Sequence, residues 1–272
     1  MAEVAAKLMH AVQYENYGGG LSGLKHVEIP IPSPKRDEVL VKLEAASLNP
    51  ADWKIQKGTL CPLVPRKFPF IPGFDVAGEI VEVGERVKKF KAGDKVVAVL
   101  HLLDGGGLAE FATATEGAGL PTCGLTAHQA LAQVGETELD GTGQLKSILI
   151  TGASGGVGHY AVQLAKQANA HVTVTCGARN IEFVKRLGAD EVLDYSTPDG
   201  AALRSPSGQK YDVKLVPLII NAKAENLDYL LKLVKEGKLK TVIDSKHSLS
   251  KAEDAWAKSM DGHATGKIIL EA

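Results

Sequence analysis

Apolar and polar residues alternate with a period of two along the first hundred residues. The alternation runs through four segments, residues 8–13, 38–44, 77–83 and 94–100. Because successive side chains of a strand point to opposite faces of a sheet, this period predicts strands with one buried face. Turn-forming clusters at Tyr17–Gly20 and Ile29–Pro34 separate the segments. The N-terminal part of the chain is therefore predicted to be a β-rich domain.

After Leu145 the pattern changes to strands that alternate with helices. We expect strands at 147–151, 171–175 and 191–195 and helices at 157–168 and 179–187. Strands that alternate with helices predict right-handed βαβ units and a parallel sheet. A fourth strand is expected to begin at Tyr211–Val213. The fold class is therefore α/β, with a β-rich domain in front.

The strand-helix alternation stops after the expected fourth strand. An amphipathic helix over 224–236 follows, and the tail reads as strand, helix and strand between 240 and 270. A six-stranded doubly wound domain needs two further βα units, on the order of 40 to 60 residues. We therefore expect a shortened sheet, with residues 214–272 returning to the first domain.

The segment Ser147–Gly158 carries the strongest chemical signal in the chain. A β-branched strand leads into Gly152, Gly155 and Gly158, and a helix follows directly. Glycines at this spacing allow a tight turn and a close approach of a pyrophosphate to the helix N-terminus. An ordinary strand-to-helix turn is the competing interpretation. The context of strand, turn and helix favours a dinucleotide site.

Composition and charge exclude several classes of protein. The 272 residues contain 31 Lys and Arg against 32 Asp and Glu, so a net charge of −1 provides no general field for nucleic acid. The basic stretch Arg86–Lys95 is interrupted by apolar residues and is read as a solvated strand and turn. The three cysteines form no CxxC pair, which is typical of a reducing compartment and excludes a cysteine-built zinc site. No apolar run reaches the ~20 residues of a membrane span, and we see no cleavable leader.

The residues after the second strand of the parallel sheet indicate which dinucleotide binds. An acid at this place hydrogen-bonds the ribose of NAD, whereas a cation accepts the 2′-phosphate of NADP. The chain has Cys176-Gly-Ala-Arg-Asn180, so Arg179 favours NADPH. A solvent-exposed helix start is the other interpretation of Arg179. A short-chain dehydrogenase is disfavoured, because Tyr195, Tyr211 and Tyr229 are not followed by a lysine four residues later.

Longer motifs carry a family resemblance. They are Leu48–Gly58, Gly73-Phe-Asp-Val-Ala-Gly-Glu-Ile-Val-Glu-Val-Gly84, Phe90–Val96, Cys176–Asn180 and Asp261–Ile268. With the glycine turn, they make the chain resemble the medium-chain dehydrogenase/reductase superfamily and, within it, the zinc-independent quinone oxidoreductase branch. The resemblance implies a GroES-like catalytic domain over 1–123 and a shortened Rossmann domain over 124–213. Residues 214–272 would complete the catalytic domain.

The resemblance also implies site residues. Residues expected to bind the cofactor NADPH are Gly152, Ala153, Ser154, Gly155, Gly156, Val157, Gly158, Arg179 and Tyr195. Residues expected on the catalytic side are Asn49, Asp52, Lys54 and Thr126. Lys54 is a candidate electrophile for the substrate oxygen, with a solvated loop charge as the other interpretation. No metal is expected, since Phe74 stands where zinc-dependent relatives carry a histidine ligand.

The function expected from the resemblance is reduction of quinones or α,β-unsaturated carbonyls by hydride transfer from NADPH. The alternative is a shortened, catalytically impaired nucleotide-binding relative, because segments that relatives carry are missing near 116–119 and 213–214. The expected partner is a small quinone or enone, with no nucleic acid. The resemblance predicts a location at the periphery of the chloroplast envelope, whereas the residues alone predict a reducing compartment such as the cytoplasm. The resemblance also makes a homodimer and peripheral membrane association possible expectations.

Overall fold

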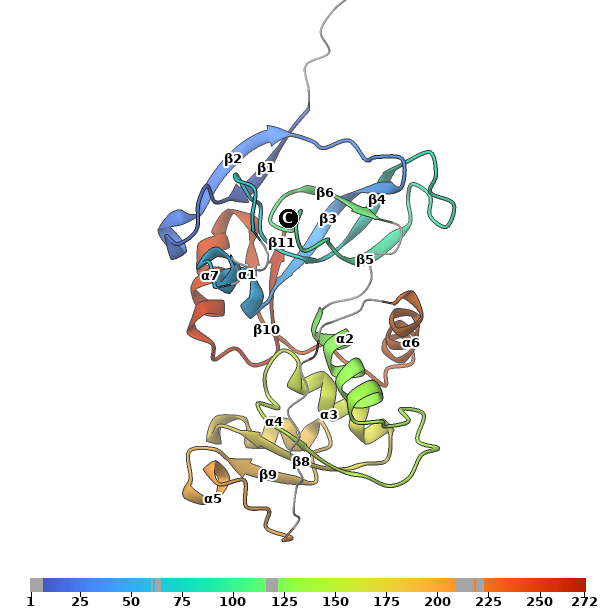
Figure 1. Ribbon diagram of the computed structural model, residues 1–272, viewed down its shortest axis with the longest axis vertical. Coiled ribbons are helices and arrows are strands. Elements are labelled where there is room, and N and C mark those ends of the chain that lie inside the picture. The colour runs from blue at the N-terminus through green and yellow to red at the C-terminus, as the bar shows by residue number, and fades with distance from the viewer. Residues whose placement is uncertain (1–6, 60, 62–64, 116–121, 209–217, 219–222) are drawn as a thin grey trace, which may run out of the picture. The chain divides into compact units, whose positions relative to one another are not determined.

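In the computed structural model the chain folds into two compact units, which are described separately. The first unit combines Met1–Thr122 with Ile243–Ala272, and the second is Cys123–Val242. The structure describes residues 7–59, 61, 65–115, 122–208, 218 and 223–272. Figure 1 shows the elements in chain order.

A mixed sheet forms the centre of the first unit. Its strands are β3 (Glu38–Leu48), β4 (Asp75–Val83), β5 (Lys95–Val99), β6 (Phe111–Thr115), β10 (Ile243–Ser248) and β11 (Lys267–Glu271). The order is β10-β11-β3-β4-β5, with β6 also paired to β3. A separate antiparallel pair joins β1 (Leu8–Gln13) and β2 (Lys25–Pro30). The predicted β-rich domain is confirmed, and its four alternating segments coincide with strands.

The C-terminal segment completes the core of the first unit. Helices α1 (Pro50–Gln56) and α7 (Ala252–Asp261) flank the sheet together with short 3₁₀ turns at Gly20–Gly23 and Leu249–Lys251. Trp256 of α7 is fully buried, in one apolar cluster with Tyr14, Phe70 and Phe74. Strand β11 lies between β10 and β3, parallel to the first and antiparallel to the second. The two ends of this unit are therefore inseparable parts of one core.

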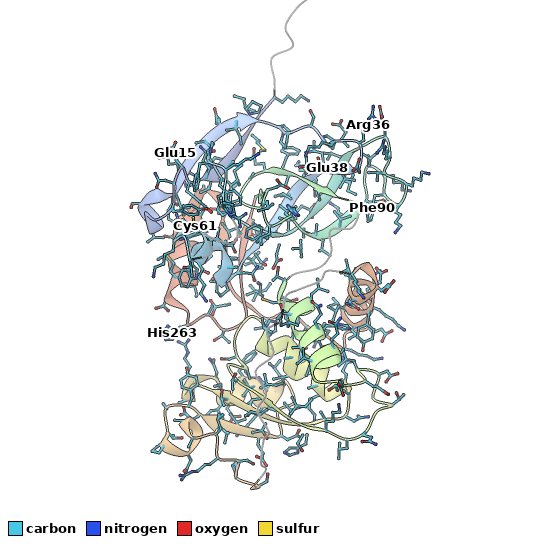
Figure 2. The ribbon with its side chains drawn as sticks, viewed as in Figure 1. Glu15, Arg36, Glu38, Cys61, Phe90 and His263 are labelled. Carbon is cyan, nitrogen blue, oxygen red and sulfur yellow. The ribbon has the colours of Figure 1, made fainter. Side chains whose placement is uncertain are left out.

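The basic stretch Arg86–Lys95 forms a turn that leads into β5. Phe90 packs against the sheet core and lies at the same end of the unit as Arg36 and Glu38 (Figure 2). The Lys95 ammonium pairs with Glu44 and Glu79. The apolar residues Val87 and Phe90 of this stretch therefore pack against the sheet core, and Lys95 forms ion pairs with acids of strands β3 and β4.

The second unit is built on three parallel strands in the order β7-β8-β9. They are β7 (Ser147–Ile150), β8 (His171–Cys176) and β9 (Glu191–Asp194), and the main helices are α2 (Thr122–Gln129), α3 (Gly158–Gln167), α4 (Ile181–Arg186), α5 (Pro198–Ala201) and α6 (Ala224–Lys235). A π-helical turn spans Ala130–Val134 and a 3₁₀ turn spans Ala178–Asn180. The predicted parallel sheet is confirmed for these three strands. The expected fourth strand at Tyr211–Val213 and both expected gaps, near 116–119 and 213–214, lie outside the described residues.

Helix α6 belongs to the second unit, although its position after residue 214 suggested the first. The Tyr229 hydroxyl donates to the carbonyl of Leu139 at 3.1 Å, and its ring meets His128 edge-on at 5.7 Å. Gln163 of α3 exchanges two hydrogen bonds with the backbone of Lys240, at 2.8 and 2.9 Å. These contacts hold residues up to Val242 in the second unit, so β10 begins at Ile243 instead of 240. None of the helices in the described residues is both long and apolar enough to cross a membrane.

Candidate functional site

The glycine turn connects β7 to α3 in the second unit, as the motif predicts. Gly152 adopts a φ of +62°, a conformation that favours glycine. Its N–H donates to the Thr175 hydroxyl at 3.1 Å, and the next N–H, of Ala153, donates to the Thr175 carbonyl at 3.0 Å. The turn is therefore anchored to the carboxyl end of the neighbouring strand β8.

Gly158 opens helix α3 at a point where the backbone leaves no room for a side chain. A Cβ at this position would lie 2.4 Å from the Gly152 carbonyl oxygen and 2.6 Å from the Ala153 Cα. The glycine thus permits the helix to pack directly on the turn, which is the role that the third glycine of a dinucleotide motif plays.

The N-terminus of α3 is suited to an anion. No side chain caps it, and its first turn holds no acidic residue. The positive end of the helix dipole favours negative charge at such a place. A pyrophosphate fits this position, so the residues present match the cofactor that the motif predicts.

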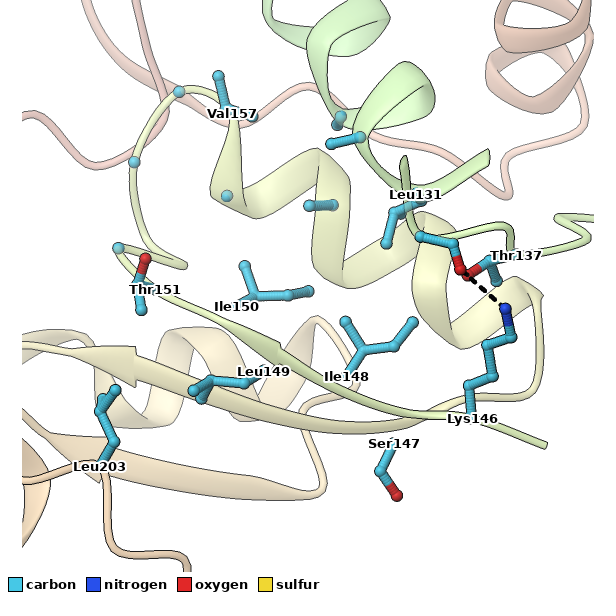
Figure 3. Close-up of a pocket in the computed structure, with 18 residues that line it drawn as sticks. Leu131, Thr137, Lys146, Ser147, Ile148, Leu149, Ile150, Thr151, Val157 and Leu203 are labelled. Carbon is cyan, nitrogen blue, oxygen red and sulfur yellow. Dashed lines mark hydrogen bonds between the residues drawn. The ribbon is translucent and has the colours of Figure 1, made fainter. Parts of the chain in front are cut away.

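A cavity of about 880 Å³ adjoins the turn (Figure 3). It runs along β7 and beneath α2 and α3. Its lining residues include Ala127, Leu131, Ile148, Ile150, Gly152, Gly155, Gly156, Val157, Gly158 and Ala161. The five predicted cofactor residues Gly152 and Gly155–Gly158 therefore share one concave surface. Ala153 is fully buried and contributes its backbone to the turn.

The ends of β8 and β9 form a second surface beside the turn. Tyr195 is 54 % exposed, and its hydroxyl lies so close to Gly177 that a Cβ there would meet it at 2.8 Å. Arg179 is exposed in the turn that follows β8. The Asn180 side chain donates to the Ser154 hydroxyl at 3.0 Å. Asn180 thus ties the glycine turn to the segment carrying Arg179, a role that the sequence analysis missed.

The predicted catalytic residues Asn49, Asp52 and Lys54 lie at or in helix α1 of the first unit. Asn49 and Asp52 are buried, whereas Lys54 is exposed, with its ammonium 5.5 Å from the Trp53 ring centroid. Asp52 accepts the N–H of Asn49 at 2.7 Å and that of Gly73 at 3.0 Å. The backbone bond from Asn49 is typical of a helix N-terminal capping box. Asp52 therefore fixes the start of α1 against the strand entry at Gly73.

Burial raises the pKa of the Asp52 carboxyl to about 7. The two backbone N–H groups lower it, while the nearby charge of Asp75 raises it further. The charge of Lys267 also lowers the pKa, but desolvation of the carboxylate is the largest effect. The group consequently titrates near neutral pH.

A buried polar network surrounds Asn49. Its amide donates to Asp75 at 2.8 Å, and its oxygen accepts the Lys267 ammonium at 2.5 Å. Lys267 also lies 3.7 Å from Asp75, and both side chains are almost fully buried. Asp75 further accepts the N–H and hydroxyl of Thr122 at 2.9 and 2.6 Å. The network joins β4, β11 and Thr122, all within the first unit.

The role of Lys267 was missed by the sequence analysis. Its signal is a single charged residue at the head of the apolar strand Lys-Ile-Ile-Leu. A buried ammonium needs an acidic partner, and only folding shows that this partner is Asp75, almost two hundred residues away.

Thr126, the fourth predicted catalytic residue, is half-buried in α2 of the second unit, next to the cavity-lining Ala127. It therefore stands on a different unit from Asn49, Asp52 and Lys54. Among the residues that the structure describes, no group of three His, Cys, Asp or Glu side chains is arranged to hold a metal.

Two family models match the chain. The model described as alcohol dehydrogenase GroES-like domain matches residues 35–170, and the model described as zinc-binding dehydrogenase matches residues 214–270.

Individual relatives match over nearly the whole chain. A chloroplast envelope quinone oxidoreductase homolog of Arabidopsis thaliana is 59 % identical, over 98 % of this chain and 100 % of the relative. An NADPH-dependent alkenal/one oxidoreductase of the same plant is 32 % identical, over 97 % of this chain and 80 % of the relative. The solved quinone oxidoreductase of Coxiella burnetii is 30 % identical and superposes with a TM-score of 0.85, covering 98 % of this chain and 100 % of that one.

The alignment with the 59 % identical relative spans 328 positions, whereas the chain has 272 residues. At least 56 aligned positions, the difference between the two numbers, therefore have no residue in this chain. This finding agrees with the expectation that the chain lacks internal segments found in its relatives.

Proposed function

Because the chain belongs to the medium-chain dehydrogenase/reductase superfamily and groups with plant chloroplast quinone oxidoreductase homologues, we propose that it is an NADPH-dependent, zinc-independent reductase. It would transfer hydride to quinones or to α,β-unsaturated carbonyls. Its relatives support an oxidoreductase role, and the family implies a nicotinamide cofactor. Among these relatives, one is named for NADPH and for alkenals and enones.

The observation that carries the proposal is the glycine turn with its uncapped helix. Gly152 and Gly155–Gly158 line one cavity, and α3 presents its N-terminus without a side-chain cap. This arrangement can bind the pyrophosphate of a dinucleotide through backbone N–H groups. Ser154 is proposed to complete this cradle, and buried Ala153, whose N–H donates to the Thr175 carbonyl, is proposed to hold the turn in shape.

When bound, the cofactor would supply hydride chemistry. The chain's own residues would bind its phosphates and orient the substrate. Hydride addition leaves negative charge on a substrate oxygen, which a donor must stabilise. Exposed Lys54 is proposed as that donor, with Thr126 at the cofactor side. Buried Asn49 and Asp52 are proposed to hold the α1 segment in place.

The Lys54 assignment is tested by Lys54→Met, with Lys57→Met as a control on the same exposed surface. We expect a fall of about tenfold in kcat/KM for an enone with Lys54→Met, and none with the control. An unchanged kcat/KM would remove Lys54 from the mechanism.

Coenzyme preference tests the role of Arg179. Arg179 and Tyr195 stand at the ends of adjacent strands, where the 2′-phosphate of NADPH is expected. In Arg179→Ser we expect the NADPH Kd to rise about tenfold or more and the NADH Kd to stay unchanged. Arg186→Ser, at the end of α4, is the control. Equal weakening of both coenzymes would contradict a 2′-phosphate contact.

A nucleotide-binding protein without turnover is the second candidate. The missing 56 or more aligned positions favour it, because they belong to segments that the full-length relatives retain. NADPH oxidation with a short enone and with a quinone, beside an NADPH thermal shift, separates the two. A shift without turnover supports the binding protein, and no shift contradicts both.

Location and assembly are also proposals. The chloroplast envelope is named for the 59 % identical relative, and we propose peripheral association with that membrane for this chain. We propose a homodimer as its assembly, which sedimentation of the purified protein tests.

A further inference from the structure

Among the described residues of the first unit, four side chains carry buried hydrogen-bond donors that have no acceptor: Tyr14, Trp53, Arg66 and Trp256. Arg66 and Tyr14 are the two considered as a site. Arg66 is 8 % exposed, and its Nε and Nη2 atoms have no hydrogen-bond partner. The Tyr14 hydroxyl, on a side chain only 1 % exposed, has none either. Buried polar groups are nearly always paired, so each exception asks for an explanation. Tyr14 belongs to the apolar cluster of Phe70 and Phe74, and the Arg66 guanidinium lies over both of these rings.

Arg66 and Tyr14 both lie beside the ring of Phe70. The Arg66 guanidinium lies 4.6 Å from the Phe70 ring centroid, and the Tyr14 ring lies 5.5 Å from it. Tyr14 and Phe70 also exchange backbone hydrogen bonds at 2.9 Å in both directions. The charge of Arg66 acts to lower the pKa of Tyr14, and Tyr14 acts to raise the pKa of Arg66. The unpaired donors therefore form one local group.

No acid in the described part of the chain takes the place of the missing acceptor. Asp52 lies within electrostatic range of Arg66, but its two oxygens accept the N–H groups of Asn49 and Gly73. Asp104 is also in range, with an 80 % exposed side chain beside His101. The remaining guanidinium nitrogen, Nη1, donates to the Leu102 carbonyl. This bond leaves the Nε–Nη2 edge as the unsatisfied side.

The chemistry of that edge selects its ligand. Nε and Nη2 point in parallel, so they match the two oxygens of a carboxylate. One carboxylate neutralises one guanidinium, whereas a phosphate dianion would add a second negative charge close to Asp52. The aromatic rings of Phe70 and Phe74, 4.6 and 5.9 Å from the guanidinium, favour an apolar molecule behind the carboxylate. Tyr14 supplies a third donor.

We propose that Arg66 and Tyr14 form a binding site for the carboxylate of an apolar organic acid. The Nε–Nη2 edge of Arg66 binds the two oxygens, and the Tyr14 hydroxyl donates to one of them. The Nε and Nη2 atoms of Arg66 and the Tyr14 hydroxyl are closed to solvent, so entry of a ligand requires a local movement of the structure around them. If the proposed reductase function holds, this group would select substrates that carry a carboxylate.

Binding is tested first on the wild-type protein without cofactor. Hexanoate and methyl hexanoate are compared by thermal shift and calorimetry at constant ionic strength. We expect hexanoate to bind and to raise Tm, and the ester to do neither. If hexanoate and its ester behave alike, the proposal is wrong.

Conservative variants locate the site. In Arg66→Lys the charge stays but the planar edge is lost, and we expect the hexanoate Kd to rise about tenfold or more. The control is Arg36→Lys, at an exposed ion pair with Glu85. Tyr14→Phe should weaken hexanoate severalfold, whereas Tyr229→Phe, in the second unit, should not. Unchanged binding in both Arg66→Lys and Tyr14→Phe would place the acid elsewhere and overturn the assignment.

Turnover adds a readout that depends on the proposed function. An aliphatic enone ending in a carboxylate is compared with its methyl ester. We expect a lower KM for the acid, and Arg66→Lys should bring the two KM values together with kcat little changed. Failure of both compounds to react contradicts the reductase, while hexanoate binding still decides the site. Equal KM values in an active wild-type enzyme contradict the substrate preference.

Discussion

At the scale of single residues, the first unit contains buried ionisable groups whose stability depends on their mutual contacts. Asp52, Asp75 and Lys267 are each at most 3 % exposed. They are held by hydrogen bonds to backbone or to Asn49, because a buried charge is costly without such partners. Sequence motifs indicated Asn49 and Asp52 but not the shared network.

Asp52 should make stability depend on pH. Its folded pKa of about 7 lies above the ordinary value of 3.8, so the folded state binds the proton more tightly. The free energy of unfolding should therefore fall as pH rises from about 4 to 7, by about 4 kcal/mol from this group. Asp52→Asn should remove this contribution, as urea unfolding at several pH values would show.

Other carboxyls add their own pH dependence, so the difference between wild type and variant is the quantity to compare. Asp254→Asn, on the exposed side of α7, serves as control and should leave the wild-type profile in place. Parallel profiles for wild type and Asp52→Asn would refute the role given to burial.

Lys267 should be among the most sensitive positions of the first unit. Lys267→Met removes the bonds to Asn49 and Leu48 and leaves Asp75 without its ammonium partner. We expect a loss of about 3–5 kcal/mol, measured by urea unfolding. Lys246→Met, which breaks an exposed pair with Glu271, should cost less than about 1 kcal/mol. Similar costs for the two variants would contradict a buried network.

At the scale of elements, the path from β7 through the glycine turn to α3 was predicted closely. Its spacing of glycines, strand and helix is a local pattern, and the Cβ clashes at Gly158 explain why that residue is glycine. Helix α1 was not predicted, because its seven residues Pro50–Gln56 are too few to show a helical period. Its start carries a local signal, the capping box of Asn49 and Asp52, and Asp52 also accepts the N–H of the more distant Gly73.

Gly158→Ala should displace the turn. The added Cβ meets only backbone atoms, at 2.4 and 2.6 Å, so the main chain must shift. We expect the NADPH Kd, measured by fluorescence titration, to rise about tenfold or more. Gly124→Ala in α2 is the matched control, because its Cβ would touch Leu230 at 3.5 Å. Equal NADPH affinity in both variants would argue against phosphate binding at this turn.

At the scale of the whole molecule, the chain leaves the first unit at Thr122 and returns at Ile243. Each unit has a core of its own. Both tryptophans, Trp53 and Trp256, belong to the first unit. Tryptophan fluorescence therefore reports the unfolding of one unit, whereas circular dichroism reports both.

Matched core substitutions should separate the units. Val41→Ala in the first unit and Val174→Ala in the second each leave a small cavity at a fully buried position. We expect each to lower the free energy of unfolding by about 2 kcal/mol. In urea, we expect Val41→Ala to lower the fluorescence midpoint and Val174→Ala to leave it unchanged while shifting the circular dichroism curve. A fluorescence midpoint lowered equally by both variants would mean that the units unfold together.

The sequence alone determined the features that depend on neighbouring residues: the β-rich and βαβ regions, the glycine turn, and the family. These follow from periodicity, glycine spacing and motifs that local chemistry dictates. Tertiary structure alone decided that α6 packs in the second unit and that Lys267 meets Asp75 and Asn49. It also decided that Arg66 Nε and Nη2 and the Tyr14 hydroxyl are buried without an acceptor among the described residues. Those facts depend on which distant segments meet and exclude water, and no local pattern encodes that.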